Sequence, residues 1–408
     1  MSDEEKDIYV VYGETVLIAK AEKSMDSSEV LHAIPLNYGD QVPISFNLKS
    51  HPKIQSYSII DDRNSPNRLL KVILRPLEED EEVRINFSYN VLIKNNKYKD
   101  LSRDTETEIP SESKLPEPVR IWLKPTKSIQ SDNIILKTRA KILKRFDNSL
   151  LKLAKKIVFL ICYQRPVLTK IRYILESITF LRDIFLPKRY WTGLTDAFSA
   201  WMFGGLCVAQ TNLAIALFRA NGVPARILIV NPLYYRSREV DWIDALHYVI
   251  EFYVPKYGWI RANAGRAPYQ PKNDIALRII YPEDENEAGN GLSYYGGMAP
   301  WFWFSNENIS LGFPEDLFTF YKKPKYSGVP ITSKKVLNIF KLKIEDAEEA
   351  FKLTQENWEI FVKLFGKEMN CKALELQQKS TDFITESKIE EYMKSIKESI
   401  NYLKNIDQ

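Results

Sequence analysis

The sequence predicts an α+β protein in which a strand-rich region, a mixed core and a helical region follow one another. Three patterns support this. Apolar and polar residues alternate early in the chain, a helix followed by two strands lies near its middle, and apolar residues recur at helical spacing near its end. With 408 residues, 45% of them hydrophobic, the chain is long enough for two or three packed domains. The predicted divisions are an antiparallel β-sandwich over 1–110, a connector over 111–136, a core over 137–325 and a helical extension over 326–408.

The first region is predicted to be an antiparallel β-sandwich. Its clearest strand covers residues 83–91, where every second residue is apolar, as in a strand with one buried face. Residues 61–67 are rich in Asp, Asn, Ser and Pro and indicate a turn between shorter apolar runs. Short strands separated by turns in this way favour a sandwich. The other predicted strands are residues 9–12, 16–19, 57–60 and 69–74.

Residues 137–189 form a basic segment, with fourteen Lys or Arg residues against three acidic ones. This segment is more basic than the whole chain, whose formal net charge is +4. It could contact an acidic partner, a nucleic acid or an anionic membrane surface. The preferred interpretation is a solvated face of the helices that lead into the core. An acidic partner stays open as the alternative, and no nucleic-acid partner is expected.

Cys207 stands at the predicted start of a helix. Gly204 and Gly205 come just before it, apolar residues follow at helical spacing, and the run 221–224, Asn-Gly-Val-Pro, predicts the end of the helix. A thiol in the first helical turn meets the positive end of the helix dipole and free backbone N–H groups, and both favour the thiolate. The alternative interpretation is a small buried core residue.

His247 and Asn263 lie in a predicted hairpin. Residues 246–255 are rich in β-branched and aromatic residues, Gly258 lies in a turn, and residues 259–263 are predicted to form the returning strand. His247 and Asn263 are therefore expected to be cross-strand neighbours. A cysteine, an imidazole and an orienting amide are the groups of a cysteine nucleophile with its general base. Alone, Asn263 could equally be a turn residue at a strand end.

The other cysteines and histidines offer no comparable arrangement. Cys162 lies in an aliphatic run, where a thiol packs without reacting, and Cys371 lies in a helical segment rich in Lys and Glu. His32 and His51 fall in the predicted sandwich, with no candidate nucleophile near them. No Cys or His cluster has the spacing of metal ligands, and no nucleotide-binding loop follows a strand, so neither a metal nor a cofactor is expected.

Three blocks of the core resemble the transglutaminase-like superfamily, which has a papain-like cysteine fold. The blocks are residues 205–226, 247–254 and 258–263. The likeness spans about residues 191–309, and its most specific part is residues 217–226, Leu-Phe-Arg-Ala-Asn-Gly-Val-Pro-Ala-Arg. The resemblance implies a helix carrying Cys207, packed on an antiparallel sheet that carries His247 and Asn263. The predicted sandwich also resembles the β-sandwich that precedes many microbial cores of this kind.

The resemblance further implies that Cys207 is the nucleophile, His247 the general base and Asn263 the residue that orients His247. Asn263 stands where that family usually has Asp. A neutral amide oxygen can suffice, because the thiolate already balances the charge of the imidazolium. The backbone N–H of Cys207 is the expected oxyanion donor. Trp191, upstream of the cysteine, is expected to line the substrate site.

The expected activity is acyl transfer on amide bonds of proteins or peptides through a thioester. Hydrolysis by a cysteine peptidase or amidase is preferred, because water is abundant and no acidic motif that would select an amine is evident. One alternative is a protein-glutamine transglutaminase. Another is a catalytically weak or inactive binding module with the same fold, which Asn263 in place of Asp would favour.

The last region is predicted to form a helical hairpin that packs on the core or on a second subunit, and packing within the chain is the preferred interpretation. Apolar residues recur every three or four positions over 347–365 and again over 389–403. Each stripe is narrow, which suits a helix with one buried face.

The sequence favours a cytoplasmic protein. Its first residues are acidic and lack the apolar run of a secretory signal, and the apolar run 158–163 is too short to span a membrane. Three scattered cysteines suit a reducing compartment. The acidic run 283–287 lacks a calcium-ligand pattern and is predicted to be a solvated loop.

Overall fold

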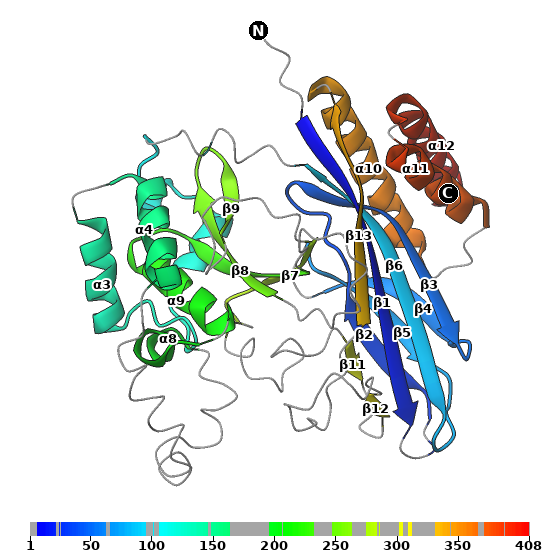
Figure 1. The fold of residues 1–408 in the computed structure, drawn as a ribbon, viewed down its shortest axis with the longest axis horizontal. Helices are drawn as coiled ribbons and strands as arrows, with labels where there is room; N and C mark the ends of the chain where they lie inside the picture. Colours follow the sequence, from blue (N-terminus) through cyan, green and yellow to red (C-terminus); the bar gives the residue numbers. More distant parts are fainter. Residues whose placement is uncertain are drawn as a thin grey trace.

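The computed structural model shows a β-sandwich flanked by helices and joined to a smaller sheet that carries its own helices (Figure 1). The C-terminal helices lie on the outer side of the sandwich, and the smaller sheet lies on its other side. The structure describes residues 6–21, 24, 26–62, 66–94, 101, 106–145, 148–163, 196–205, 207–231, 247–262, 275–283, 285, 302–304, 309–311, 331–342, 344–365, 371–386 and 388–407.

The two larger sheets are antiparallel and confirm the predicted sandwich. One has the strand order β12-β1-β6-β3, with β13 also paired to β1, and the other has the order β11-β2-β5-β4. The strands are β1 (Lys6–Ala21), β2 (Ser28–Ala33), β3 (Gln41–His51), β4 (Ser56–Asp61), β5 (Arg68–Leu74), β6 (Glu82–Lys94), β11 (Phe302–Phe304), β12 (Ile309–Leu311) and β13 (Ile331–Leu342). Apolar residues of both sheets belong to one buried cluster.

Strand β6 shows why the sandwich could be predicted. The apolar residues that alternate along it are all buried, from Val83 to Val91, whereas Glu82 and Arg84 on either side of Val83 are exposed. Because successive side chains of a strand point to opposite faces, this pattern places one face of β6 in the hydrophobic interior of the sandwich.

Three strands of the sandwich come from segments predicted to belong elsewhere. β11 and β12 fall within the predicted core over 137–325 but pair with β2 and β1. β13 falls at the start of the predicted helical extension over 326–408, yet it pairs with β1 from Val16↔Ile331 to Lys6↔Leu342. These pairings join residues far apart in the sequence, so a local pattern could not indicate them.

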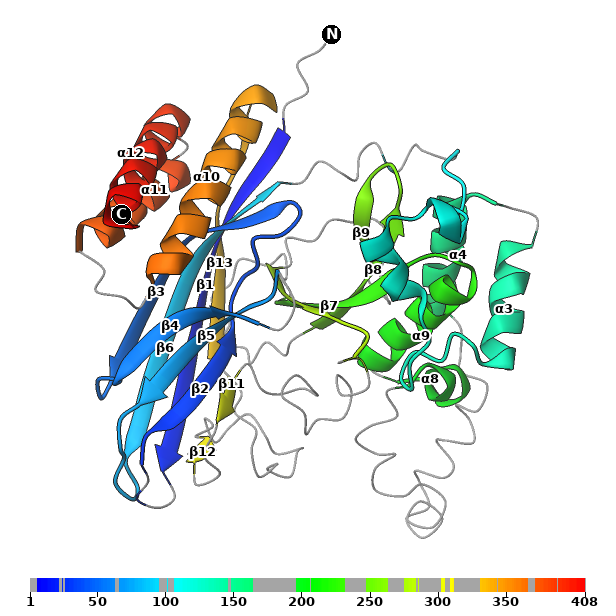
Figure 2. The ribbon, with the colours of Figure 1, turned by 180° about the vertical axis from the view of Figure 1, so that it is seen from behind.

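Three helices follow β13 and pack on the sandwich (Figure 2). They are α10 (Ile344–Leu364), α11 (Cys371–Thr385) and α12 (Ile389–Asp407). α10 and α12 carry the two predicted apolar stripes, and α11 lies between them in the chain. Phe365 contacts Phe46 of β3 at 5.5 Å and Tyr57 of β4 at 5.1 Å between ring centroids. The preferred packing within the chain is therefore confirmed, and the surface that receives these helices is the sandwich.

The core is a four-stranded antiparallel sheet with the order β10-β7-β8-β9, covered on one face by α9. Its strands are β7 (Ala225–Asn231), β8 (His247–Val254), β9 (Gly258–Ala262) and β10 (Ile275–Ile280). Its helices are η1 (Glu112–Lys114), α2 (Glu117–Arg120), η2 (Ile121–Leu123), α3 (Ile134–Lys144), α4 (Leu150–Tyr163), α8 (Ala197–Phe203) and α9 (Cys207–Ala220). The cysteine helix, α9, ends where the sequence predicted, and Gly222 just after it has a positive φ. β8 and β9 form the predicted hairpin, and Gly258 in its turn also has a positive φ.

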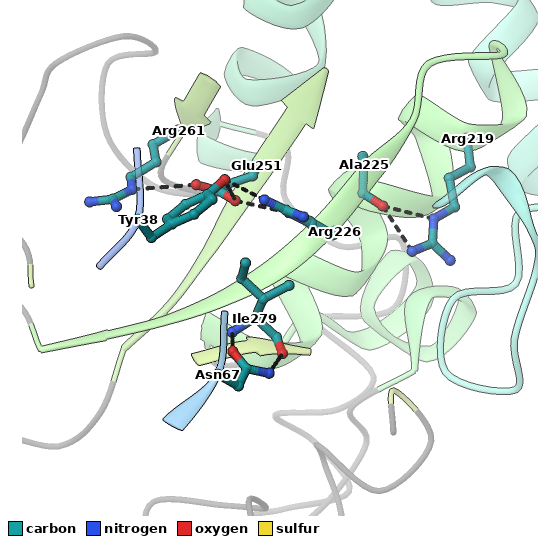
Figure 3. A network of polar contacts seen from close by, with 8 residues as sticks. All are labelled: Tyr38, Asn67, Arg219, Ala225, Arg226, Glu251, Arg261 and Ile279. Carbon is teal, nitrogen blue, oxygen red and sulfur yellow. Dashed lines mark hydrogen bonds and ion pairs between the residues drawn. The ribbon is translucent and has the colours of Figure 1, made fainter. Parts of the chain in front are cut away.

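The sandwich contacts the core at β10, which stands at one end of the strand order of the core sheet. The side-chain amide of Gln41 donates to Ala276 O at 3.0 Å and accepts from Ala276 N–H at 2.7 Å. Asn67 makes the same pair of bonds with Ile279, at 2.7 and 2.8 Å (Figure 3). An edge strand otherwise presents unpaired backbone groups. The backbone N–H of Leu36 also donates to Ala276 O, at 2.9 Å. The two buried amide side chains and this backbone group thus pair the edge of β10 with the sandwich.

Within the described residues, no single helix is both long and apolar enough to cross a membrane. The bent pair formed by α8 and α9 meets the length and composition criteria together, and α9 is the buried helix of the core.

Candidate active site

Cys207 is the first residue of α9, as the sequence predicted. The preceding helix, α8, ends at Phe203, and Gly204 then adopts a φ of +76°, a conformation that favours glycine. The axes of α8 and α9 differ in direction by 111°. This sharp turn leaves the half-buried thiol of Cys207 at the N-terminal end of α9, where the helix dipole is positive.

His247 is the first residue of β8 and lies opposite Val230 of β7. Its imidazole hydrogen-bonds the Cys207 thiol, and the sulfur also accepts from the backbone N–H groups of Tyr248 and Val208. Burial of the thiol opposes its ionisation. The hydrogen bond and positive charge of His247, together with the two backbone groups, outweigh that effect and lower the pKa of the Cys207 thiol. The surroundings of Cys207 therefore favour its thiolate form.

Contacts in the following turns fix α9 against β8. The Thr211 hydroxyl, one turn after the cysteine, donates to the backbone oxygen of Tyr248 at 3.1 Å. Further along, Phe218 stacks on Phe252 with centroids 4.9 Å apart and ring planes 8° from parallel. All four residues are buried. The positions of Cys207 and His247 thus follow from packing between two regular elements, which holds a site more firmly than loops do.

Asn263 and Trp191, the other two residues expected at the site, lie outside the described residues. The last described residue of β9, Ala262, pairs with Ile250 of β8. The hairpin that was predicted to bring residue 263 toward His247 is therefore present up to Ala262. The roles of Asn263 and Trp191 stay predictions.

The first arginine of the motif at residues 217–226, Arg219, has a structural role. Arg219 donates to the backbone oxygen of Ala225 at 2.8 and 3.0 Å, to that of Lys124 at 2.7 Å, and to Glu285 in a fully buried ion pair. One side chain thus joins the end of α9, the start of β7 and two distant segments. The prediction of a solvated loop over 283–287 is wrong for Glu285, whose side chain has no exposed surface. A buried carboxylate needs such a partner, and the sequence gives no sign of one so far away.

The second arginine of the motif, Arg226, lies in a cluster on the sheet face opposite α9 (Figure 3). Its Nε lies 3.0 Å from Glu251 Oε2, and its guanidinium lies 3.8 Å from the ring centroid of Trp259. Arg261 approaches the other oxygen of Glu251 at 3.5 Å. Tyr38 of the sandwich donates to Glu251 at 2.9 Å and accepts from Arg226.

Tyr38 is held protonated in this cluster, because burial and the adjacent Glu251 carboxylate raise its pKa well above the usual value of a tyrosine. A protonated hydroxyl can donate to Glu251 and accept from Arg226 at once. Glu251 belongs to the same strand as His247, so this cluster ties the sandwich to the strand that carries the candidate base.

Comparison with known proteins finds a family similarity in the central part of the chain. The model of the transglutaminase-like superfamily matches residues 168–264, which include Cys207, His247 and Asn263. Residues 168–264 are therefore similar to the core of that superfamily. No curated protein matches the chain.

Two solved structures resemble the chain. One is described as "a Putative Cysteine Protease from Cytophaga hutchinsonii", with 16% identity and a TM-score of 0.45 over 81% of this chain and 98% of that one. The other is "a Putative Protease from Parabacteroides distasonis", with 10% identity and a TM-score of 0.25 over 65% of this chain and 47% of that one.

The described groups around Cys207 suit nucleophilic chemistry at sulfur. A lowered thiol pKa, an adjacent imidazole and backbone donors at a helix start are the features that activate a cysteine. The sequence had singled out Cys207 and His247 but not Thr211 or Tyr248, whose contacts depend on the packing of α9 on β8. Among the residues that the structure describes, no three His, Cys, Asp or Glu side chains come together as metal ligands would.

Proposed function

We propose that this protein is a cysteine-dependent acyl-transfer enzyme that hydrolyses amide bonds of proteins or peptides through a thioester. The observation that carries the proposal is the hydrogen bond between His247 and a Cys207 thiol of lowered pKa at the start of α9. The match of residues 168–264 to the transglutaminase-like superfamily supports it, since a cysteine nucleophile is expected of that core.

The proposed reaction has two halves. In the first, the Cys207 thiolate attacks the amide carbonyl carbon, a C–S bond forms, and the carbonyl oxygen becomes an oxyanion. The backbone N–H of Cys207, at the helix start, is the proposed donor to that oxyanion. As the C–N bond breaks, the His247 imidazolium gives its proton to the leaving amine, and a thioester remains on the sulfur.

In the second half, neutral His247 takes a proton from water, and the resulting hydroxide attacks the thioester carbonyl. The C–S bond breaks, a carboxylic acid leaves, and the thiolate–imidazolium pair is restored. Asn263 is proposed to accept a hydrogen bond from the other imidazole nitrogen and so keep the ring turned toward the sulfur. A primary amine in place of water would give a new amide instead, which is the transglutaminase reaction.

Mass spectrometry of peptide mixtures tests this proposal. The protein is incubated with peptides in ¹⁸O-labelled water, with and without a primary amine, beside a Cys207→Ala control. We expect new carboxyl groups that carry ¹⁸O, formed by the native protein alone and still formed when the amine is present. Amine adducts in place of hydrolysis would assign amine transfer. No product from a protein whose Cys207 also fails to react with alkylating agents would favour the binding-module alternative.

A further inference from the structure

The outer face of α3 and α4 exposes apolar side chains to an unusual degree. Among the described residues, seven large hydrophobic side chains are exposed, and four of them lie on these two helices. Ile134 is 74% exposed and Phe159 is 62% exposed. We call this surface the α3–α4 face, and it consists of Ile134, Ile135, Lys137, Lys141, Ile142, Lys152, Lys155, Lys156 and Phe159, all of them exposed.

The buried residues of α3 lie on one side of the helix, and its exposed isoleucines lie on another. Leu136 and Ala140 make the buried stripe of α3, and Arg139 beside them lies over the Trp201 ring of α8 at 5.5 Å. Ile134 and Ile142 lie on the opposite side of the helix, away from α8 and α9. Apolar residues on the outer side of a helix indicate a surface that binds another molecule or a membrane.

The α3–α4 face is cationic as well as apolar. Three lysines and Phe159 form one exposed stripe along α4, and neither helix contains an acidic residue. Lys156 reaches the backbone oxygen of Leu143 at 3.4 Å, so the stripe of α4 lies beside the end of α3. Lysines and large apolar side chains are therefore both exposed on these two adjacent helices.

We propose that the α3–α4 face docks on an anionic phospholipid bilayer. A bilayer interface offers phosphate groups to lysines and an apolar layer just beneath them to isoleucine and phenylalanine, and surface-bound helices use this combination. A nucleic acid would satisfy the lysines but leave the isoleucines in water. In both ribbon views α3 and α4 lie on the side of the molecule remote from the sandwich (Figures 1 and 2).

Vesicle sedimentation tests the proposal with the full-length protein. Vesicles contain either phosphatidylcholine alone or phosphatidylcholine with about one-third phosphatidylserine, at low and at physiological salt. We expect binding to the anionic vesicles only, weaker at higher salt because ions screen the lysines. Lys137→Glu with Lys141→Glu should weaken binding by roughly thirtyfold or more. Ile134→Ser with Ile135→Ser should weaken it by roughly tenfold.

The matched control is Lys49→Glu with Lys53→Glu, which makes the same charge change on exposed lysines of the sandwich. This control should bind like the native protein, and thermal melts should show all variants folded. Equal binding by face and control variants would overturn the proposal, and so would no binding to anionic vesicles at low salt. Isoleucine variants that unfold more easily without changing vesicle binding would show instead that the chain itself covers the face. If the protein bound soluble polyglutamate but not anionic vesicles, the partner of the α3–α4 face would be an acidic protein instead of a membrane.

Discussion

Cys207→Ala should abolish amide hydrolysis, because the proposed thioester needs the sulfur as its acyl carrier. His247→Ala should lower kcat/KM by roughly a hundred- to ten-thousandfold, since it removes the proposed base and the cation beside the thiolate. Asn263→Ala should have a smaller effect, roughly ten- to a hundredfold, because it removes only the orienting hydrogen bond. Initial rates on the best peptide from the mass-spectrometric screen give these values.

Cys162→Ala is the matched control for these variants. Cys162 is also a partly buried cysteine, and it packs at the edge of the apolar cluster of the core. The control should keep full activity. Activity that survives in Cys207→Ala, or that disappears equally in Cys162→Ala, would contradict the role of Cys207.

Glu251→Ala should destabilise the protein by about 3–5 kcal/mol, because it leaves the buried guanidinium of Arg226 without its carboxylate. Tyr38 would lose its acceptor in the same step. Urea unfolding followed by circular dichroism measures the free energy of unfolding. The expected loss is a large fraction of the stability of an ordinary domain.

Glu349→Ala provides the comparison. Glu349 pairs with Lys397 at 2.8 Å, but both side chains are about half exposed, and such a pair contributes about 0–1 kcal/mol. If both substitutions lowered the free energy of unfolding by the same small amount, the cluster around Arg226 would not hold the sandwich to the core.

Most of the correct predictions from the sequence depended on residue patterns within a single helix, strand or turn. The alternation along β6, the Asn-Gly-Val-Pro stop after α9 and the turn at Gly258 all depend on neighbouring residues, and the structure has each of them. Cys207 and His247 come together because α9 packs on β8, as the resemblance to transglutaminase-like proteins implied.

Features that depend on distant partners could not be predicted. β13 is a strand because β1 lies beside it, and Glu285 is buried because Arg219 lies opposite it. Gln41 and Asn67 are ordinary polar residues in the sequence, yet each caps the edge of β10 with two hydrogen bonds. In all three cases folding brings together residues that are distant in the sequence. Composition and periodicity describe only neighbouring residues, so they could not predict these contacts.

The pH dependence of Cys207 alkylation tests the central claim most directly. Iodoacetamide reacts with the thiolate, so the rate of labelling, followed by peptide mass spectrometry, reports the thiol pKa. We expect Cys207 to react near pH 6, where an ordinary thiol with a pKa of about 8.5 is almost fully protonated, and Cys162 to react slowly. His247→Ala should move the midpoint for Cys207 upward, because the hydrogen bond and charge that lower its pKa are lost. A Cys207 midpoint at the ordinary thiol value, unchanged in His247→Ala, would contradict the thiolate–imidazolium pair.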